Sequence, residues 1–142
     1  MGAKLKIYLA GTSDYNALKY RQDAKNSFSN KLTLFDPFTE VENSITNFEL
    51  GKPWQLSNEQ VEKIVVGDKE AINTCDIVVA YIENCTFGTT MEILHAWNNN
   101  IPVFIINPEQ NLIHDVWLRY HTTKFFTSTN ECFKFIIKEV SK

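Results

Sequence analysis

Short apolar segments recur along the chain, and each is bounded by glycine, proline, asparagine or aspartate. They span residues 5–10, 32–35, 76–82, 101–106 and, more weakly, 124–127. Continuous runs that are rich in β-branched and aromatic residues predict strands buried on both faces, as in a parallel sheet.

The segments between these runs have apolar residues at helical spacing, which predicts amphipathic helices. The stripes are Ala17, Tyr20, Ala24 and Phe28; Val61, Ile64, Val65 and Ile72; Leu112, Ile113, Val116, Trp117 and Tyr120; and Phe133, Ile136, Ile137 and Val140. Strands and helices therefore alternate. This order predicts an α/β fold: a doubly wound, mostly parallel five-stranded sheet with helices on both faces, of flavodoxin-like or Rossmann-like type.

A fold of this kind binds its ligands beyond the carboxyl ends of the strands, where the strand order reverses. We therefore expect the site in the loops that follow the first, third and fourth strands. Residues 36–57 have two prolines and little periodicity, which predicts a long loop, with one short helix, that covers the site. Trp54, Trp97 and Trp117 are expected to be packing residues, with the alternative that Trp54, which lies in this loop, covers a base.

Composition narrows the class of protein. A length of 142 residues suits one domain, spanning 1–142. The net charge of −3 comes without a basic stripe, which argues against nucleic acid as a partner and favours a small molecule. No apolar run is long enough for a signal peptide or a membrane span, so we expect a cytoplasmic protein without membrane contact.

Cysteine and histidine spacing gives no sign of a metal. Cys75, Cys85 and Cys132 are odd in number and lack C-x-x-C spacing, so we expect reduced thiols, with Cys132 in the core. The three histidines have no metal-ligand spacing. The loop Gly11-Thr12-Ser13 could offer backbone and hydroxyl donors to a phosphate or a sugar, but it matches no nucleotide-binding motif, and Asp14 would repel an anion. No metal or cofactor is expected.

Glu92 is the first candidate for chemistry. It lies in the segment GTTMEILHAW at 88–97, which predicts a glycine turn opening into a helix with Glu92 in its first turn. Backbone N–H groups and the helix dipole would keep the carboxylate ionised there, as a nucleophile requires. The alternative is structural: Thr89-x-x-Glu92 also fits a capping box.

Asp68 and Tyr8 are the next candidates. Asp68 lies on the apolar stripe of its helix, three residues after Val65 and four before Ile72. It is either solvated at the helix end or a second carboxyl that reaches the strand ends. Tyr8, in the first strand, is either a core residue or a hydroxyl that needs a partner such as Glu92. Two carboxyls beside a glycosidic bond can divide the roles of nucleophile and proton donor.

These segments resemble the nucleoside 2-deoxyribosyltransferase family and the related 2′-deoxynucleoside 5′-phosphate N-hydrolases. The resemblance rests on the opening IYLAG, on DKEAINTCDIVVAYI at 68–82, on GTTMEILHAWNNNIPVFII at 88–106 and on the long loop between them. It covers most of the chain. The order and spacing of the segments support this resemblance more strongly than any single segment does.

The resemblance implies roles for particular residues. Glu92 matches the nucleophile that attacks C1′ of the sugar, Tyr8 the tyrosine that positions it, and Asp68 the acid implicated in departure of the base. Asn111 matches a residue donated to a neighbouring subunit's site, since the family forms dimers or dimers of dimers. A homo-oligomer is therefore implied, with a nucleoside or nucleotide as the small-molecule substrate.

Thr86 departs from the family pattern and leaves the reaction open. Many transferases have an aspartate two residues before the turn glycine, here Gly88, whereas the nucleotide hydrolases have a serine that contacts the 5′-phosphate. A threonine hydroxyl could do the same, but the first loop has Asp14 in place of the arginine expected beside a phosphate. The hypotheses are a base-exchanging transferase, which we favour, an N-glycoside hydrolase, and a non-catalytic nucleotide-binding module.

Overall fold

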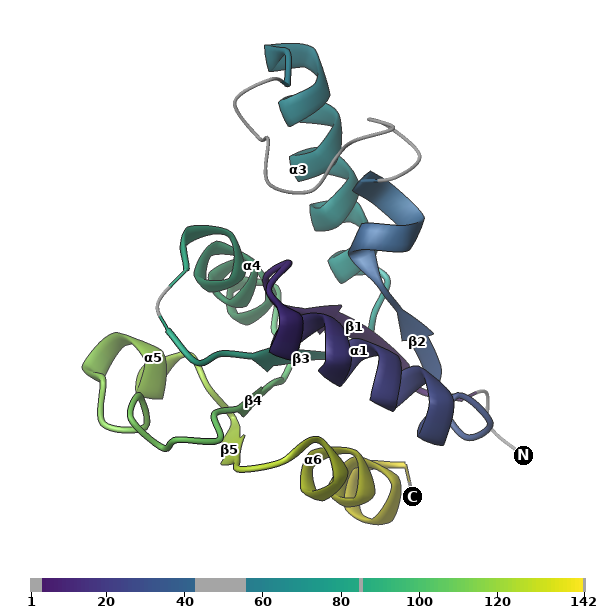
Figure 1. Cartoon of the computed structure of the whole chain (residues 1–142), viewed down its shortest axis with the longest axis vertical. Helices are drawn as coiled ribbons and strands as arrows, with labels where there is room; N and C mark the ends of the chain where they lie inside the picture. The colour runs from purple at the N-terminus through teal and green to yellow at the C-terminus, as the bar shows by residue number, and fades with distance from the viewer. Residues whose placement is uncertain (1–3, 43–55, 85, 142) are drawn as a thin grey trace.

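The computed structural model describes residues 4–42, 56–84 and 86–141. Its centre is a parallel sheet with the strand order β2-β1-β3-β4-β5 (Figure 1). The strands are β1 Lys6–Ala10, β2 Thr33–Phe35, β3 Ile77–Tyr81, β4 Val103–Ile106 and β5 Lys124–Phe126. Every strand pair in the sheet is parallel, so all carboxyl ends meet at one edge. The predicted fold class is confirmed, and the strand ends differ from the prediction by one or two residues.

Helices cover both faces of this sheet (Figure 1). They are α1 Tyr15–Phe28, α3 Asn58–Asn73, α4 Phe87–Asn98, α5 Val116–Tyr120 and α6 Thr129–Phe135, with π-helical turns η1 Phe38–Glu42 and η3 Ile136–Val140. α1 packs beside α6, and α3 packs beside α4. The order of strands reverses between β1 and β3, which makes the carboxyl edge of these two strands the expected ligand position.

Alternate residues of the central strands belong to two separate hydrophobic cores. Ile7 and Leu9 of β1 belong to the core under α1 and α6, whereas Tyr8 and Ala10 belong to the core on the other face. This follows from the two-residue period of a strand. The side chain of Tyr8 therefore points to the same face as α4.

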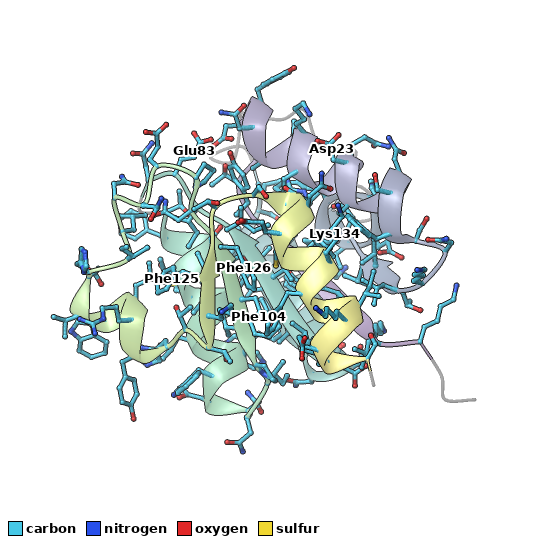
Figure 2. The ribbon with its side chains drawn as sticks, turned by 90° about the horizontal axis from the view of Figure 1, so that it is seen from below. Asp23, Glu83, Phe104, Phe125, Phe126 and Lys134 are labelled. Atoms are coloured by element: carbon cyan, nitrogen blue, oxygen red, sulfur yellow. The ribbon has the colours of Figure 1, made fainter. Side chains whose placement is uncertain are left out.

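The core under α6 is aromatic. Figure 2 shows Phe104 and Phe126 between the sheet and α6, and their rings meet edge to face at 5.8 Å between centroids. Phe133 of α6 stacks on Phe28 of α1 in the same core. Cys132 is fully buried beside them, as predicted. Cys75 and Cys132 are free thiols, while Cys85 lies outside the described residues.

The helical stripes are only partly confirmed. The stripe on α1 is buried throughout, but on α3 only Ile72 is buried. The prediction for the third stripe is wrong, because α5 begins only at Val116 and has no buried residue. Trp117, expected to pack, is 76% exposed, since apolar spacing does not distinguish a core-facing side from an exposed apolar surface. Trp54 and most of the predicted covering loop lie outside the described residues.

Tyr20 of α1 anchors this helix to the sheet through its buried hydroxyl. Its hydroxyl donates to the carbonyl oxygens of Ala10, at 2.7 Å, and Val79, at 3.1 Å. Complete burial raises the pKa of the Tyr20 phenol well above its ordinary value of 10.0. The neutral form is therefore favoured in the folded state.

The raised pKa predicts a pH effect on stability. The contribution of Tyr20 is complete below pH 10 and is lost as the pH rises further, because only the unfolded chain then ionises readily. Tyr20→Phe should lower the free energy of unfolding at pH 8 by about 1–2 kcal/mol through the lost hydrogen bonds. Its stability should then fall less steeply than that of the wild type up to pH 11, as measured by urea unfolding. Parallel pH profiles would contradict this prediction.

Among the described residues, no helix combines the length and apolar character needed to cross a lipid bilayer.

Candidate active site

A cleft of about 790 Å³ opens at the carboxyl edge of the sheet, where the strand order reverses. Its lining comes from four places: the loop after β1, the segment after β2, one side of α3 and one side of α4. The residues that matter below are Gly11, Thr12, Ser13, Pro37, Phe38, Asp68, Lys69, Thr86, Gly88, Glu92 and His95. The structure thus brings together two acids, Asp68 and Glu92, that lie 24 positions apart in the sequence.

Glu92 is oriented by a residue from β1, an interior strand of the sheet. The hydroxyl of Tyr8 donates a hydrogen bond to Oε2 of Glu92. Tyr8 is fully buried and stacks on Phe35 of β2, with 5.7 Å between ring centroids. A phenol fixed in this way holds one carboxylate oxygen, and Glu92 itself lines the cleft.

The start of α4 corrects two expectations about Glu92. The helix begins at Phe87 with Thr86 as its N-cap, so Glu92 lies in the second turn and not in the first. Thr89 is inside the helix and buried, and cannot be the N-cap of a capping box with Glu92. The sequence suggested the box because the glycine at 88 resembled the turn before a helix. Capping therefore does not account for the position of the carboxylate.

Asp68 faces the cleft from α3 rather than lying in solvent at the helix end. It is partly buried and lines the cleft with its neighbour Lys69. α3 packs directly against α4, which is why the two carboxyl groups share one cavity. The basic side chains of Lys69 and His95 also line this cleft.

The loop after β1 lies at one side of the cleft. Gly11, Thr12 and Ser13 all line it. The Thr12 hydroxyl donates to the carboxylate of Asp14, which also accepts from the Ala17 N–H at 3.1 Å and so caps α1. The positive end of α1 is thus already balanced by a carboxylate of the chain itself.

The first turn of α4 lies at another side of the cleft. The Thr86 side chain makes no capping hydrogen bond, and its buried hydroxyl oxygen has no hydrogen-bond partner among the described residues. A Cβ built on Gly88 would meet nothing within 4 Å, so the backbone there is open to a ligand. The first N–H groups of a helix have no partner within the helix. This turn therefore offers donors to an oxygen-rich group.

Asn111 is not among the residues that line this cleft. Its side chain accepts a hydrogen bond from Asn107 at 3.0 Å and donates to the Glu83 carbonyl oxygen at 3.3 Å. Asn107 is fully buried and also donates to the Ile82 carbonyl oxygen at 2.7 Å. The pair holds the connection that leads from β3 to α4.

The sequence predicted that residues 36–57 cover the site, but it singled out none of the residues that contribute from the segment after β2. Pro37 and Phe38 line the cleft, and so does His95, whose Nε2 lies 2.8 Å from Oδ1 of Asn73. The signal was available, because β2 is adjacent to β1 and its carboxyl end lies at the same edge. Within the described part of the chain, no group of three or more His, Cys, Asp or Glu side chains is arranged to hold a metal ion.

Fold and cleft together define a doubly wound α/β protein with a pair of acids at its topological switch point. The chain belongs to the family described as nucleoside 2-deoxyribosyltransferase like, whose sequence profile matches residues 4–110. A comparison with curated protein sequences finds no match.

Solved structures share the fold. A 2-deoxyribosyltransferase from Bacillus psychrosaccharolyticus superposes with a TM-score of 0.69 at 24% identity, over 89% of each chain. A conserved protein from Enterococcus faecalis V583 gives 0.68 at 16% identity, over 96% of this chain and 99% of that one. A CMP N-glycosidase from Clostridium botulinum gives 0.59 at 16% identity, over 92% of this chain and 96% of that one. At such identities the likeness concerns the fold.

Proposed function

We propose that the chain is an enzyme that cleaves the N-glycosidic bond of a (deoxy)nucleoside through a glycosyl-Glu92 intermediate and passes the sugar to another base. The observation that carries this proposal is the Glu92 carboxylate, held by the buried Tyr8 hydroxyl in a cleft that also contains Asp68. Family membership and the position of the cleft at the switch point support it.

The proposed reaction has two displacements at C1′ of the sugar. An oxygen of Glu92 forms a bond to C1′ while the C1′–N bond breaks and its electron pair leaves with the base. Asp68 assists that departure by positioning the base or supplying a proton. A nitrogen of a second base then attacks C1′, its N–H proton passes to the Asp68 carboxylate or to water, and the bond from C1′ to Glu92 breaks to release the carboxylate. Tyr8 keeps the carboxylate aimed in both steps.

Backbone and hydroxyl donors of the cleft are proposed to bind the sugar. Gly11, Thr12 and Ser13 contact it from the loop after β1, and Thr86 and Gly88 contact it from the first turn of α4. All five line the cleft. No cofactor is needed for this chemistry.

The alternative is a hydrolase that acts on a (deoxy)nucleoside 5′-monophosphate. The observation in its favour is the open first turn of α4, with the Thr86 hydroxyl directed to no partner among the described residues. The similar structure from Clostridium botulinum is that of a CMP N-glycosidase. In this case water replaces the acceptor base. A non-catalytic nucleotide-binding module remains the second alternative.

One assay separates these functions. The protein is incubated with the four deoxynucleosides, the four ribonucleosides and their 5′-monophosphates, with and without a free acceptor base, and base release is followed by chromatography. Exchange only with acceptor supports the transferase. Release without acceptor identifies the hydrolase, and binding without either reaction identifies the non-catalytic module.

Asp14 is expected to disfavour a 5′-phosphate. Asp14→Asn keeps a side chain that caps α1 well but removes its charge. The change should raise kcat/KM for a 5′-monophosphate several-fold, because the repulsion between two charges about 4 Å apart in water is on the order of 1 kcal/mol. The value of kcat/KM for the nucleoside should not change. The gain should shrink at high salt. An equal change for both substrates would contradict this effect of charge.

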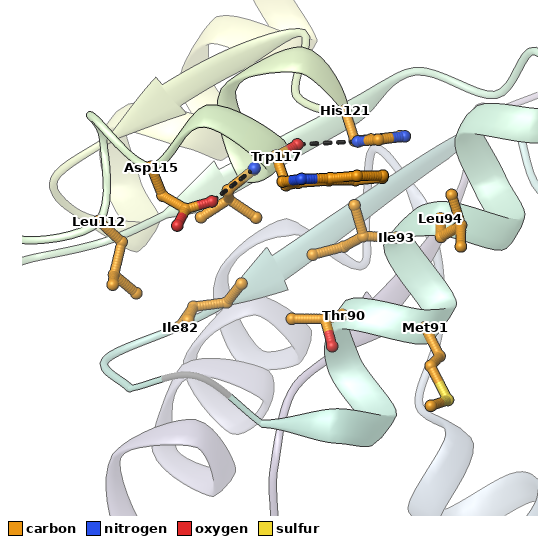
Figure 3. A pocket seen from close by; sticks show the side chains of 10 residues that line it. Ile82, Thr90, Met91, Ile93, Leu94, Leu112, Asp115, Trp117 and His121 are labelled. Carbon is orange, nitrogen blue, oxygen red and sulfur yellow. Dashed lines mark hydrogen bonds between the residues drawn. The ribbon is translucent and has the colours of Figure 1, made fainter.

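A second copy of the chain is proposed to cover the exposed apolar face of α4 and α5. Figure 3 shows the groove between these helices, about 340 Å³ in volume, with Met91 and Leu94 on one side and Trp117 on the other. Their exposed fractions are 65%, 42% and 76%. An exposed apolar groove whose wall includes the Trp117 indole suits a two-fold interface, in which both copies use one patch. Met91 and Leu94 also line the catalytic cleft, so the partner would lie beside it.

The oligomer can be tested by substituting the indole. Trp117→Lys should convert a dimer into a monomer in analytical ultracentrifugation, because a charge would be buried in the interface. Tyr15→Lys is the matched control, since Tyr15 is 77% exposed on α1 and should leave the dimer intact. A wild-type chain that sediments as a monomer at tens of micromolar would rule out this interface. Asn111 is proposed to reach the partner's cleft in the dimer.

A further inference from the structure

Arg21 of α1 is a buried cation close to the cleft. Its side chain is 1% exposed, and its Nε lies 3.7 Å from Oδ1 of Asp36, which is also buried. Lys25 holds the other oxygen of Asp36 at 2.8 Å. Burying a guanidinium is costly, and its Nε and Nη1 have no hydrogen-bond partner among the described residues. If this side chain only filled space in the interior, an apolar residue of similar size would make the folded state more stable.

The guanidinium of Arg21 contacts the loop that follows β1. Nη2 of Arg21 donates a hydrogen bond to the carbonyl oxygen of Thr12. A Cβ built on Gly11 would lie 2.7 Å from Nη1, so a larger residue at position 11 would have to displace the guanidinium. Gly11 and Thr12 both line the cleft. The position of this loop therefore depends on the position of the guanidinium.

The same guanidinium supports the segment after β2. Its Cζ lies 4.5 Å from the centroid of the Phe38 ring, in cation–π geometry. The Phe38 N–H donates to Oδ1 of Asp36 at 3.0 Å, the oxygen nearest to Arg21. Phe38 lines the cleft with Pro37. One side chain thus contacts two segments that bound the same cavity.

We propose that Arg21 is a positioning residue that sets the separation of residues 11–13 and 36–38 and so determines how tightly the cleft binds its substrate. The proposal rests on the proposed function. Glu92 is oriented separately, by Tyr8 of β1. Loss of the Arg21 contacts should therefore weaken substrate binding more than it slows the chemical step.

Arg21→Lys tests this proposal. Lysine keeps the charge beside Asp36, but its ammonium group cannot donate to Thr12 and stack on Phe38 at once. KM for the best nucleoside should rise roughly tenfold, as expected for the loss of one charged hydrogen bond, with little change in kcat. Lys25→Met is the matched control: it removes the other cation on Asp36, and KM should stay at the wild-type value.

A second control separates positioning from general destabilisation. Phe133→Leu weakens the core under α6, away from the cleft, and should lower the melting temperature without raising KM. The proposal is overturned if Phe133→Leu or Lys25→Met raises KM as much as Arg21→Lys does. It is also overturned if Arg21→Lys lowers kcat and leaves KM unchanged.

If the wild type releases no base from any nucleoside or nucleotide, the proposed enzymatic function is refuted. Hydrogen exchange then still tests the role of Arg21. In Arg21→Lys, peptides covering residues 11–13 and 36–38 should both exchange faster than in Lys25→Met, because their shared support is lost. Unchanged exchange in either peptide would show that Arg21 does not hold the two segments together.

Discussion

Glu92→Gln is expected to lower kcat by roughly 10⁴-fold or more, because an amide cannot form the glycosyl ester. The substituted chain should fold normally, since the Tyr8 hydroxyl can still donate to the amide oxygen. Base release gives the rate, and circular dichroism with the melting temperature checks the fold. With the wild type, mass spectrometry of a rapidly quenched reaction should find the sugar mass on the peptide that contains Glu92.

Glu83 provides a control of the same chemical type. Its carboxylate also accepts a hydrogen bond from a tyrosine, Tyr81, at 2.6 Å, but it does not line the cleft. Glu83→Gln should therefore keep nearly full activity. Equal losses in Glu83→Gln and Glu92→Gln would mean that both act through the fold, and turnover by Glu92→Gln close to that of the wild type would refute covalent catalysis by Glu92.

Asp68→Asn is expected to have the second largest effect, a loss in kcat of about 10²–10⁴-fold, which is the usual contribution of proton transfer or leaving-group assistance. The loss should be much smaller for a nucleoside whose base already carries a positive charge, such as an N7-methylated purine. Such a base needs no help to depart. Comparing kcat for the two substrates measures this difference directly.

Glu70 lies two residues further along α3 and is exposed, so Glu70→Gln controls for changes in the charge of this helix. It should leave both rates unchanged. If Asp68→Asn slows the two substrates equally, Asp68 does not assist departure of the base. Its contribution would then be to bind or orient the nucleoside.

The strands and the fold class could be predicted because parallel strands covered on both faces have continuous apolar sequences. α1 could be predicted because its apolar stripe faces the core along its whole length. The same criterion gave the wrong result for α5, whose apolar residues form an exposed surface. Periodicity reports that a face is apolar, and whether that face meets the core or another molecule depends on tertiary structure.

Individual residues of the candidate site could be predicted from the sequence, but the way they are arranged in space could not. The strand-end rule placed Gly11 and Gly88 near a ligand, and the need of a buried phenol for a partner indicated the Tyr8–Glu92 contact. The sharing of one cleft by Asp68 and Glu92 follows from the packing of α3 on α4, which no local pattern specifies. Arg21 escaped notice because it lies among the polar positions of α1 in the sequence.

The hydrogen bond from Tyr8 joins the Glu92 carboxylate to β1, an interior strand of the sheet, rather than to a loop. Heat should consequently abolish turnover in the same cooperative transition that melts the sheet, without an earlier inactivation step. If Glu92 reacts as proposed, substitutions in the loops around the cleft should change which substrate is preferred, while the direction from which Glu92 approaches the sugar should stay the same.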